Sequence, residues 1–259
     1  MTTALVTGAS SGIGLEIARE LAAQKMRLVL TARQEQALQD LAQELRRQHA
    51  VEVLVLPFDL AKAESPQQLY AELQKRGWTI DVLVNNAGFG DHGAFTQSNW
   101  RKQAQMLQVN VVALTELTHL FLPAMCSRKS GSILNVASTA AFQAGPWMSV
   151  YYATKAYVLS FSEAIAEELR PFGVTVTALC PGPTQSQFMQ TAGTGKIALF
   201  AKFKIPSSHA VAVYGVHALN NGQVIAVHGW MNRLMVVMGK ISPRSLTRKI
   251  VMKLQESRP

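Results

Sequence analysis

The sequence predicts an α/β fold, a doubly wound parallel sheet of seven strands with helices on both faces. Short apolar runs alternate with longer segments of helical periodicity along most of the 259 residues. Apolar strands that are separated by helices imply a parallel sheet whose two faces are both covered. No linker rich in Ser, Gly or Pro and no repeat of about 20 to 50 residues interrupts the pattern, so we expect residues 1–259 to form a single domain.

The same unit of strand, turn and helix recurs from the N-terminus. In its first copy, the apolar residues 4–6 lead through a glycine-rich turn to Ile13, Ile17 and Leu21, which have the spacing of one helix face. The predicted strands are residues 4–6, 27–30, 51–56, 81–84, 132–137, 174–179 and 223–227. The predicted helices are one that begins at Ile13 and those at 35–48, 66–76, about 98–126, 151–170 and 207–219. Residues 184–206 are a long insertion, which we expect to be a lid over the substrate.

The composition limits the class of protein. Hydrophobic residues make up 48% and charged residues 16%, which excludes a disordered or fibrous chain. Cys126 and Cys180 form neither a disulfide framework nor a CxxC pair, and the six histidines show no ligand spacing, so no metal site is expected. There is no basic leader and no run of about 18 apolar residues, so we expect a cytoplasmic protein.

The net charge of +9 comes entirely from the C-terminal quarter. Residues 186–259 contain 10 Lys and Arg and a single acid, Glu256, whereas residues 1–185 are neutral overall. Such a field attracts phosphates, an acidic carrier protein or an anionic membrane surface. The alternative is a solvated basic tail. Because the segment has no recognition motif, nucleic acid is not an expected partner.

A glycine-rich turn connects the first predicted strand to the first helix. Its sequence is Thr7-Gly8-Ala9-Ser10-Ser11-Gly12-Ile13-Gly14. Glycine permits a tight turn and a close approach of the backbone to a pyrophosphate, and the helix N-terminus adds free N–H groups. The turn therefore favours a Rossmann-type dinucleotide site over a purely structural turn. The residues expected to bind the cofactor here are Gly8, Ser10, Ser11, Gly12, Ile13 and Gly14.

Arg33 decides which dinucleotide is expected. An acidic residue about 20 positions after the turn binds the 2′-hydroxyl of the adenosine ribose, whereas an Arg accommodates a 2′-phosphate. Ala32 stands at that position, Arg33 follows it, and the nearest acid is Glu35. The pattern favours NADP(H). The alternative is that Arg33 is an exposed residue in the first turn of the next helix.

A tyrosine and a lysine at the start of a predicted helix have the spacing of an acid–base pair. Tyr151 and Lys155 are at i and i+4, on one helix face. The ordinary pKa of a phenol, about 10, makes it a poor acid or base at neutral pH, and a nearby ammonium lowers that pKa. Tyr152 is also one turn from Lys155, so geometry leaves the choice between the two tyrosines open.

Together these segments resemble the short-chain dehydrogenase/reductase family. The matching motifs are Thr-Gly-x-x-x-Gly-x-Gly at 7–14, Asp59-Leu60, Asn-Asn-Ala-Gly at 85–88, Asn110, Ser138, Tyr-x-x-x-Lys at 151–155 and Pro181-Gly182-Pro183-Thr184. They stand in the family's order and spacing and span most of residues 1–185. The resemblance selects Tyr151 as the acid and leaves Tyr152 a packing role.

The resemblance implies the roles of four catalytic residues. Ser138 would donate a hydrogen bond to the substrate carbonyl, and Tyr151 would protonate it as hydride arrives from the nicotinamide. Lys155 would hold the nicotinamide ribose and lower the pKa of Tyr151, and Asn110 would anchor a water that resupplies the proton. The implied function is reversible reduction of a carbonyl group by NADPH. The alternative, a regulator that binds NADP(H) without turnover, has no need for all four residues.

The resemblance also implies further contacts with the cofactor. Asp59 is expected beside the adenine, Asn86 beside the adenosine ribose and Gly182 beside the nicotinamide. The expected cofactor-binding residues, besides the glycine turn and Arg33, are Asp59, Leu60, Asn86, Ala87, Gly88, Tyr151, Lys155, Pro181, Gly182 and Thr184.

Apolar side chains flank the expected catalytic residues. They are Phe89, Phe142, Trp147 and Met148, and the 184–206 insertion adds Phe188, Met189, Ile197, Leu199, Phe200 and Phe203. Because binding pockets are mostly apolar, we expect a hydrophobic carbonyl substrate. A 3-oxoacyl thioester on coenzyme A or an acidic carrier protein, a simple ketone and a steroid-like compound all meet this description. The alternative for each side chain is a place in the core or in an interface.

The C-terminal region, residues 229–259, departs from the family pattern. Many tetrameric members end soon after a last strand with an Asp-Gly-Gly segment, whereas here an apolar segment begins at Trp230 and several cations follow it. The departure puts the usual tetramer in doubt and favours a homodimer. We expect an apolar helix flanked by cations, which would lie on a membrane surface, cover the substrate mouth or form a partner interface.

Overall fold

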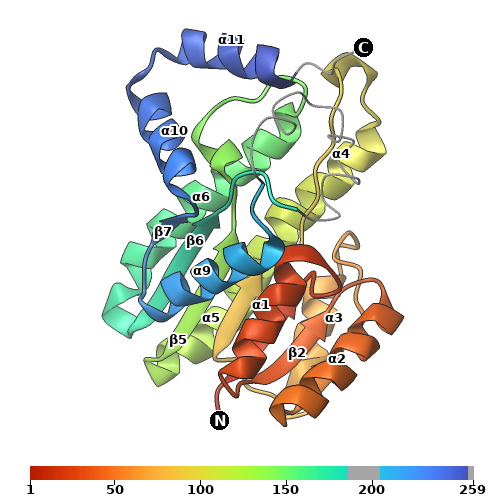
Figure 1. Cartoon of the computed structure of the whole chain (residues 1–259). Helices are drawn as coiled ribbons and strands as arrows, with labels where there is room; N and C mark the ends of the chain where they lie inside the picture. The colour runs from red at the N-terminus through yellow and green to blue at the C-terminus, as the bar shows by residue number, and fades with distance from the viewer. Residues whose placement is uncertain (186–204, 256–259) are drawn as a thin grey trace.

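Seven parallel strands form one sheet in the order β3-β2-β1-β4-β5-β6-β7 (Figure 1). The computed structural model describes residues 1–185 and 205–255. The strands are β1 (Thr3–Thr7), β2 (Arg27–Thr31), β3 (Val53–Val55), β4 (Val82–Asn85), β5 (Gly131–Val136), β6 (Val174–Cys180) and β7 (Ile225–Val227). Every predicted strand is present, and the predicted Rossmann-type sheet is confirmed.

Helices connect the strands. The α-helices are α1 (Gly12–Ala23), α2 (Glu35–His49), α3 (Ser65–Lys75), α4 (Trp100–Leu107), α5 (Leu114–Arg128), α6 (Ser149–Leu169), α9 (Ser208–Asn220), α10 (Trp230–Ile241) and α11 (Arg244–Gln255). The other helical segments are the 3₁₀ helices η1 (Phe95–Gln97), η3 (Thr139–Phe142) and η4 (Arg170–Phe172) and the π-helix η2 (Gln108–Ala113).

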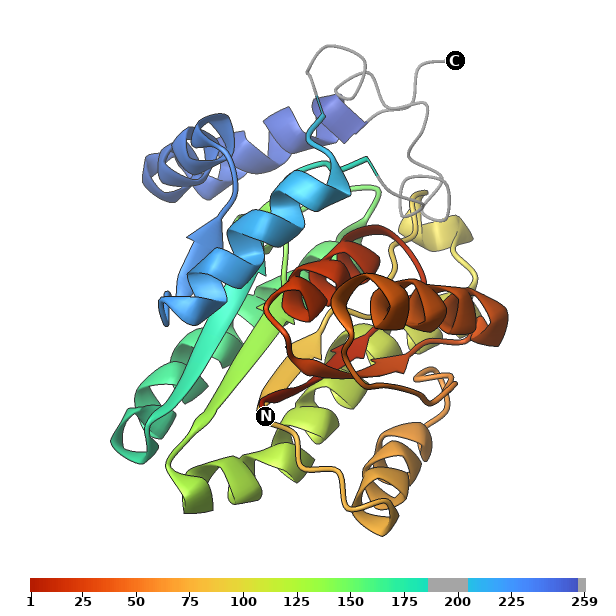
Figure 2. The same ribbon diagram turned by 60° about the horizontal axis from the view of Figure 1, so that its bottom comes forward.

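The two faces of the sheet bury separate hydrophobic cores. Successive side chains of a strand point to opposite faces. Along β1, Ala4 and Val6 accordingly belong to one core and Leu5 belongs to the other. Helices α1, α2 and α9 cover the first face, and α3, α5 and α6 cover the second (Figure 2). Burial on both faces explains why the strands are continuous apolar runs in the sequence.

The sheet changes its direction of growth between β1 and β4. The first three strands extend from β1 to β3, and the chain then returns to place β4 on the other side of β1. In open α/β sheets, ligands bind beyond the carboxyl ends of the strands at such a switch point. The segments that follow β1, β4, β5 and β6 therefore meet at one edge, which we call the catalytic edge. Figure 1 shows α10 and α11 at the end of the molecule opposite the N-terminus.

The predicted helix over residues 98–126 is interrupted. The π-helix η2 separates α4 from α5 within one helical stretch, Trp100–Arg128. By length and composition alone, this stretch of 29 residues could cross a membrane. Leu117, Phe121 and Met125 of α5 are buried in the second core, so the stretch is a core element of this fold.

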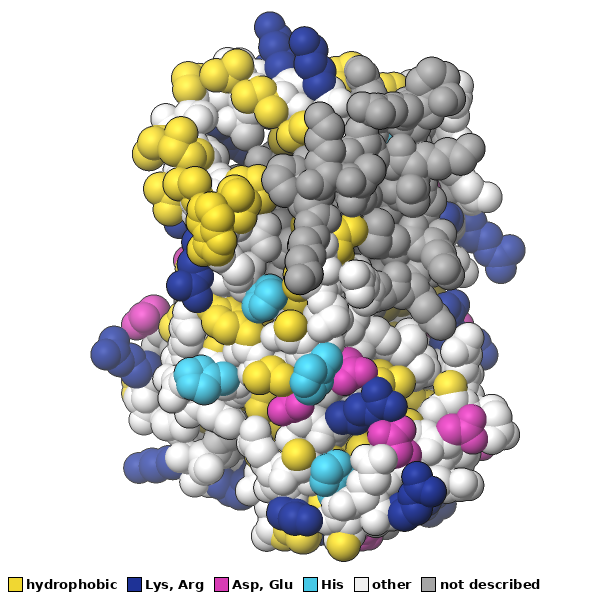
Figure 3. All heavy atoms as spheres, viewed as in Figure 1, with side chains coloured by type: hydrophobic (Ala, Val, Ile, Leu, Met, Phe, Trp, Pro, Cys, Tyr) yellow, Lys and Arg dark blue, Asp and Glu magenta, His cyan; other side chains and the backbone are white. Residues whose placement is uncertain are grey.

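Two helices, rather than one, follow the last strand. Ser242 and Pro243 separate α10 from α11, because proline cannot continue the hydrogen bonding of the preceding helix. Among the described residues of the pair, the buried ones are Val236, Val251 and Gln255. Many of the others are apolar side chains that face outward (Figure 3).

The predicted lid, residues 184–206, lies mostly outside the described residues. Its two described ends are held together: the Gln185 N–H donates to the Pro206 carbonyl at 3.0 Å, and Ser208 Oγ donates to the Gln185 carbonyl at 2.7 Å. The apolar side chains predicted for the lid, which lie outside the described residues, are Phe188, Met189, Ile197, Leu199, Phe200 and Phe203.

Replacing Leu83 by Ala should destabilise the protein strongly. Leu83 lies in β4 and is completely buried in the second core. Loss of its side chain removes buried apolar surface and leaves a cavity, which lowers the free energy of unfolding by about 2–5 kcal/mol. Urea denaturation followed by circular dichroism measures the change. The matched control Leu107→Ala, at a position that is 37% exposed, should shift that free energy by less than about 0.5 kcal/mol. Equal shifts would contradict the burial of β4.

Candidate active site

The glycine turn after β1 is shaped by the neighbouring strand. Gly8 and Gly12 have positive φ angles of 66° and 58°, a conformation that favours glycine. The Gly8 N–H donates to the Thr31 carbonyl of β2 at 2.8 Å. Ser11 is the N-cap residue of α1, and its side chain makes no capping hydrogen bond. The turn thus ends in the kind of helix N-terminus that binds phosphate groups.

Asn86 supports this turn from the side of β4. Its Nδ2 donates to the carbonyl oxygens of Thr7 at 2.9 Å and Gly8 at 3.2 Å, and its N–H donates to Thr7 Oγ1 at 3.0 Å. A Cβ on Gly8 would lie 2.8 Å from Asn86 Nδ2, and a Cβ on Gly14 would collide with the same atom. Glycine is therefore required at both positions because the Asn86 side chain fills the space. The supporting role of Thr7 had no signal in the sequence.

The turn fits the pyrophosphate of a dinucleotide, because close backbone approach and an uncapped helix N-terminus coincide there. Beside it lies a hollow of about 470 Å³ that extends to the segment after β6. The residues that line this hollow are Ser10, Ser11, Gly12, Leu15, Glu16, Gln185, Ser207, Ser208 and His209. Three residues of the predicted cofactor set thus face one hollow.

Arg33 and Asp59 follow the neighbouring strands β2 and β3. Arg33 is exposed, stands just before the N-cap of α2 and forms no ion pair within the described part of the chain. Asp59 is half-buried, and its Oδ1 accepts a hydrogen bond from the Ala61 N–H at 3.1 Å. Leu60 is buried beside it. The cofactor contacts of these residues stay predictions.

Tyr151 and Ser138 form a hydrogen-bonded pair beyond the end of β5. Tyr151 lies in the first turn of α6, and Ser138 is the N-cap residue of η3. The Tyr151 phenol is hydrogen-bonded to the Ser138 side chain. Ser138 Oγ also accepts from the Ala140 N–H at 3.1 Å and donates to the Pro181 carbonyl at 3.4 Å. The two groups predicted to contact a substrate carbonyl are therefore brought together.

Lys155 lies next to the Tyr151 ring. Its Nζ is 5.9 Å from the ring centroid and donates to the Val136 carbonyl at 2.7 Å. Both side chains are buried. Burial lowers the pKa of Lys155 to about 8. Burial also raises the pKa of Tyr151 above its ordinary value, and the hydrogen bond with Ser138 offsets only part of that rise.

The net shift of the Tyr151 pKa is therefore upward, which is opposite to the predicted lowering. Desolvation of the phenol outweighs the other influences, and the Lys155 amine is held by the Val136 carbonyl. The raised pKa keeps the phenol protonated at neutral pH. A protonated phenol is the form that a proton donor requires.

A π-helix directs Asn110 toward the catalytic edge. Such a turn holds one more residue than a regular turn, and it often occurs at functional sites. Asn110 Oδ1 accepts from the Phe89 N–H at 3.1 Å, and Nδ2 donates to the Phe89 carbonyl at 3.0 Å and to Thr154 Oγ1 at 3.1 Å. A Cβ on Gly88 would lie 3.0 Å from Asn110 Oδ1 and 3.6 Å from Lys155 Nζ. Gly88, Asn110 and Lys155 thus meet at one point.

A buried polar network lies behind the catalytic residues. Asn85 Nδ2 donates to Asn135 Oδ1 at 3.0 Å and to Thr118 Oγ1 at 3.1 Å, and Asn135 Nδ2 donates to Ser162 Oγ at 2.9 Å. The network joins β4 and β5 to α5 and α6. Because α6 carries both Tyr151 and Lys155, the network fixes the position of these side chains relative to the sheet. Asn85 belongs to the motif at 85–88, but Thr118, Asn135 and Ser162 stand within apolar runs and carry no spacing signal, so the network could not be predicted.

The segment after β6 contacts the first turn of α10. A Cβ on Gly182 would lie 2.6 Å from the Asn232 side chain, so a larger residue there would displace that side chain. Thr184 is buried, and its Oγ1 donates to the Gly182 carbonyl at 3.0 Å. Gly182 and Thr184 follow β6 at the catalytic edge, and their contacts with the cofactor stay predictions. Asn232 had no signal in the sequence because it belongs to the region that departs from the family.

The two adjacent tyrosines have different surroundings. Their rings are in T-shaped contact, 6.1 Å apart. The Tyr152 hydroxyl accepts a hydrogen bond from Gln255 Nε2 of α11, and the Gln255 carbonyl lies 2.9 Å from His92 Nε2. Tyr152 therefore anchors α11, whereas Tyr151 pairs with Ser138.

An apolar wall stands beside Tyr151. Met106, Ala140 and Met148 form a buried cluster with it, and Phe89 packs against them. Trp147 has a positive φ of 68°, and its buried indole N–H has no partner among the described residues. Strained backbone of this kind is concentrated at functional sites.

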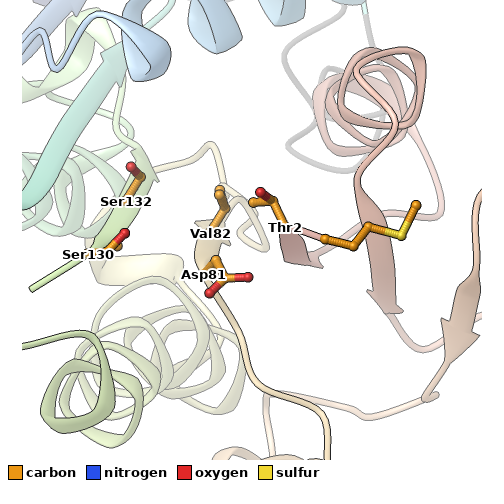
Figure 4. A pocket seen from close by; sticks show the side chains of 7 residues that line it. Thr2, Asp81, Val82, Ser130 and Ser132 are labelled. Carbon is orange, nitrogen blue, oxygen red and sulfur yellow. The ribbon is translucent and has the colours of Figure 1, made fainter. Parts of the chain in front are cut away.

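A second hollow lies at the opposite end of the sheet (Figure 4). It measures about 370 Å³ and is lined by Met1, Thr2, Asp81, Val82, Ser130, Gly131 and Ser132. Asp81 Oδ2 accepts from the Thr3 N–H at 2.9 Å, and Asp81 Oδ1 lies 3.5 Å from Arg128 Nη2. These residues stand at the amino ends of β1, β4 and β5, where open α/β sheets do not bind their ligands. The hollow is therefore separate from the active site.

Replacing Lys155 by Met should change how stability depends on pH. The pKa of Lys155 is about 8 in the folded chain and 10.5 ordinarily, so the unfolded chain binds more protons between these values. In the wild type, this residue makes the free energy of unfolding rise with pH over that window. The variant lacks this rise, and below pH 8 it is more stable by up to about 3 kcal/mol. Urea titrations without cofactor, at several pH values, measure the difference in the free energy of unfolding between wild type and variant. The exposed control Lys62→Met should show no such pH-dependent difference. A pH-independent difference would contradict the buried amine.

Comparisons with known proteins agree with this geometry. A family model for short chain dehydrogenase matches residues 2–196. The chain is 32% identical to the ketoacyl reductase HetN of Nostoc sp. over 250 residues, which cover 95% of this chain and 87% of that protein. The solved short-chain dehydrogenase from Sphingobium yanoikuyae in complex with NADPH has a TM-score of 0.83 and 29% identity and covers 93% of both chains.

The bulky-bulky ketone specific alcohol dehydrogenase from Comamonas testosteroni has a TM-score of 0.78 and 27% identity, over 95% of this chain and 94% of that one. The family model covers most of the chain, and the likeness to these relatives has a similar extent. The chain belongs to the short-chain dehydrogenase/reductase family and is an oxidoreductase that interconverts carbonyl and alcohol groups with a nicotinamide dinucleotide.

Proposed function

We propose that this enzyme reduces the carbonyl group of a hydrophobic substrate with hydride from NADPH. The observation that carries the proposal is the buried Tyr151 phenol, which is hydrogen-bonded to Ser138 at the catalytic edge. NADPH, when bound, supplies the hydride. The protein's own residues supply the proton and the hydrogen bond that polarises the carbonyl.

Tyr151 and Ser138 complete the electron and proton balance of the reduction. A hydride brings two electrons and one hydrogen nucleus to the carbonyl carbon, so the oxygen must gain one proton to become an alcohol. Ser138 donates a hydrogen bond to the carbonyl oxygen, and Tyr151 transfers its phenolic proton to it. The Lys155 Nζ lies 5.9 Å from the centroid of the phenol ring. In its protonated form, the Lys155 amine stabilises the resulting tyrosinate. The same steps in reverse oxidise an alcohol.

Lys155 and Asn110 support this proton transfer. In this proposal Lys155 holds the nicotinamide ribose, and Asn110 anchors a water that returns a proton to Tyr151. The Asn110 and Lys155 side chains both lie against Gly88 and so lie near one another, which these roles require.

Arg33 accounts for a preference for NADPH over NADH. Its guanidinium is exposed beyond β2 and has no carboxylate partner within the described part of the chain, so it is free to pair with a 2′-phosphate. The Sphingobium yanoikuyae structure, similar over 93% of both chains, is in complex with NADPH. Both observations favour the phosphorylated cofactor.

The apolar wall beside Tyr151 favours a bulky hydrophobic substrate. Met148 and Phe89 pack next to the phenol, which leaves Tyr151 and Ser138 as the orienting polar groups. Two of the similar proteins are a ketoacyl reductase and an alcohol dehydrogenase specific for bulky ketones. A 3-oxoacyl thioester therefore comes first among the substrate classes, and bulky ketones and steroid-like compounds follow.

Tyr151→Phe should remove turnover and keep cofactor binding. The variant loses the proton donor but no group predicted to contact the adenosine half of the cofactor, so kcat/KM should fall about 10²- to 10⁴-fold. NADPH oxidation with acetoacetyl coenzyme A and a panel of bulky ketones measures the rate, and NADPH fluorescence measures binding. Tyr152→Phe is the matched control and should retain most of the activity, because Tyr152 is bonded to α11 instead of Ser138. Near wild-type turnover in Tyr151→Phe on any reduced substrate would refute the mechanism.

Arg33→Ala should weaken NADPH binding selectively. Loss of a charge-assisted hydrogen bond to a phosphate costs about 1.5–3 kcal/mol, which corresponds to a rise in Kd of about 10- to 100-fold. The Kd for NADH should stay unchanged, because NADH lacks the 2′-phosphate. Isothermal titration calorimetry with both cofactors measures the two constants. Arg47→Ala, an exposed arginine in the last turn of α2, is the control and should alter neither. An equal loss of affinity for NADPH and NADH would show that Arg33 does not determine the cofactor preference.

A further inference from the structure

Exposed apolar side chains are concentrated on α10 and α11. Trp230 is 71% exposed and Ile241 is 72% exposed. The other exposed apolar residues of the pair are Met231, Leu234, Met235, Val237, Met238, Leu246, Ile250, Met252 and Leu254. We call these residues together the C-terminal apolar surface, and Figure 3 shows apolar side chains gathered over both helices. An apolar surface of this extent on a protein in water marks a site of interaction.

The exposed residues follow the period of each helix. On α10, Trp230, Leu234 and Ile241 fall on one side of the helix, and the buried Val236 faces the opposite way. On α11, Leu246, Ile250 and Leu254 stand four residues apart in one stripe. Each helix is therefore amphipathic with its apolar stripe turned away from the protein, which is the reverse of a helix that packs on a core.

The charged residues of these helices are all positive. Residues 229–255 contain six Lys and Arg and no Asp or Glu. They are Arg233, Lys240, Arg244, Arg248, Lys249 and Lys253, and all six are exposed. Among the described residues, none of these six cations forms an ion pair. Apolar stripes bordered by unpaired cations are the pattern of helices that lie in the interface of an anionic bilayer.

We infer that α10 and α11 dock on the surface of a membrane that contains anionic lipids. The C-terminal apolar surface enters the boundary between headgroups and acyl chains, and the cations contact lipid phosphates. Charge complementarity decides between this occupant and a second copy of the chain. Two copies joined through this surface would bring the positive charges of one copy against those of the other, with no Asp or Glu in residues 229–255 to offset them, which opposes association. An acidic carrier protein would match the cations but leave the apolar stripes in water.

The docked helices also border the active site. Gln255 of α11 is bonded to Tyr152, and Asn232 of α10 lies against Gly182. Lys240 Nζ lies 5.7 Å from the centroid of the Phe142 ring, next to the catalytic edge. Docking therefore brings the catalytic edge close to the membrane. The inference rests on the two helices alone and does not require the proposed function.

Flotation of the full chain with vesicles tests the inference. One set contains phosphatidylcholine alone, and the other contains phosphatidylcholine and phosphatidylglycerol in a ratio of two to one. At low salt we expect the apparent affinity for the anionic vesicles to exceed that for the neutral ones by about tenfold or more. Added salt should reduce this difference, because it screens the cations.

Two double variants separate the apolar and the charged contributions. Leu234→Ser with Ile241→Ser, and Lys249→Glu with Lys253→Glu, should each lower vesicle binding by about tenfold or more. The matched controls are Phe95→Ser with Phe172→Ser, and Lys62→Glu with Lys75→Glu, which change exposed residues elsewhere and should bind like the wild type. Thermal unfolding of every variant checks that it remains folded. Tyr151→Phe should bind vesicles normally, so a failure of the proposed function is distinguishable from a failure of docking.

Three outcomes would overturn the inference. The first is a folded wild type that binds neither kind of vesicle at low salt. The second is a wild-type dimer in sedimentation velocity that the Leu234→Ser and Ile241→Ser double variant converts to a monomer without any effect on vesicle binding, which would assign the surface to a second copy. The third is vesicle binding that all the variants retain.

Discussion

The contact between the Asn86 amide and the glycine turn is the constraint on which the catalytic edge depends. Asn86 follows β4, whereas the turn follows β1, and the two strands meet at the switch point of the sheet. The amide fills the space that side chains at Gly8 and Gly14 would need. The backbone that approaches the cofactor is thereby fixed to the strand that leads to Gly88. One side chain thus couples the glycine turn after β1 to the segment after β4.

Buried polar groups extend this coupling through the sheet. From Gly88 the contacts pass to Asn110 and Lys155, and behind them Asn85 and Asn135 connect the strands to the helices. Hydrogen bonds are strong inside a low-dielectric core, so the bonds that Asn85 Nδ2 and the Asn135 amide make fix the geometry of their neighbours. The burial that fixes Tyr151 also raises its pKa. Rigidity and proton affinity at this edge therefore have the same physical origin.

Local patterns account for what the sequence could predict. The strands and helices were recognisable because apolar spacing is a property of neighbouring residues. Ser138 was recognisable because it follows a strand, and Tyr151 and Lys155 were recognisable because their spacing puts them on one helix face and matches the family motif. Contacts between distant segments carry no such pattern. Neither the packing of Asn232 on Gly182 nor the bond from Gln255 to Tyr152 could be predicted, because both depend on the packing of α10 and α11. The prediction that the pKa of Tyr151 is lowered failed for a related reason. Helical spacing shows that a lysine is near, but it does not show how far burial removes the phenol from water.

The π-helical turn around Asn110 restricts how this gene can vary. Its six residues, Gln108–Ala113, accommodate one position more than regular winding would. Loss of a single codon here would let the helix adopt regular winding and would rotate every position on one side of the gap by about 100° relative to the other. The Asn110 amide would then turn away from Phe89, or the buried side chains of α5 would turn away from the sheet. Point substitutions leave this phase intact, whereas a deletion within the turn would not.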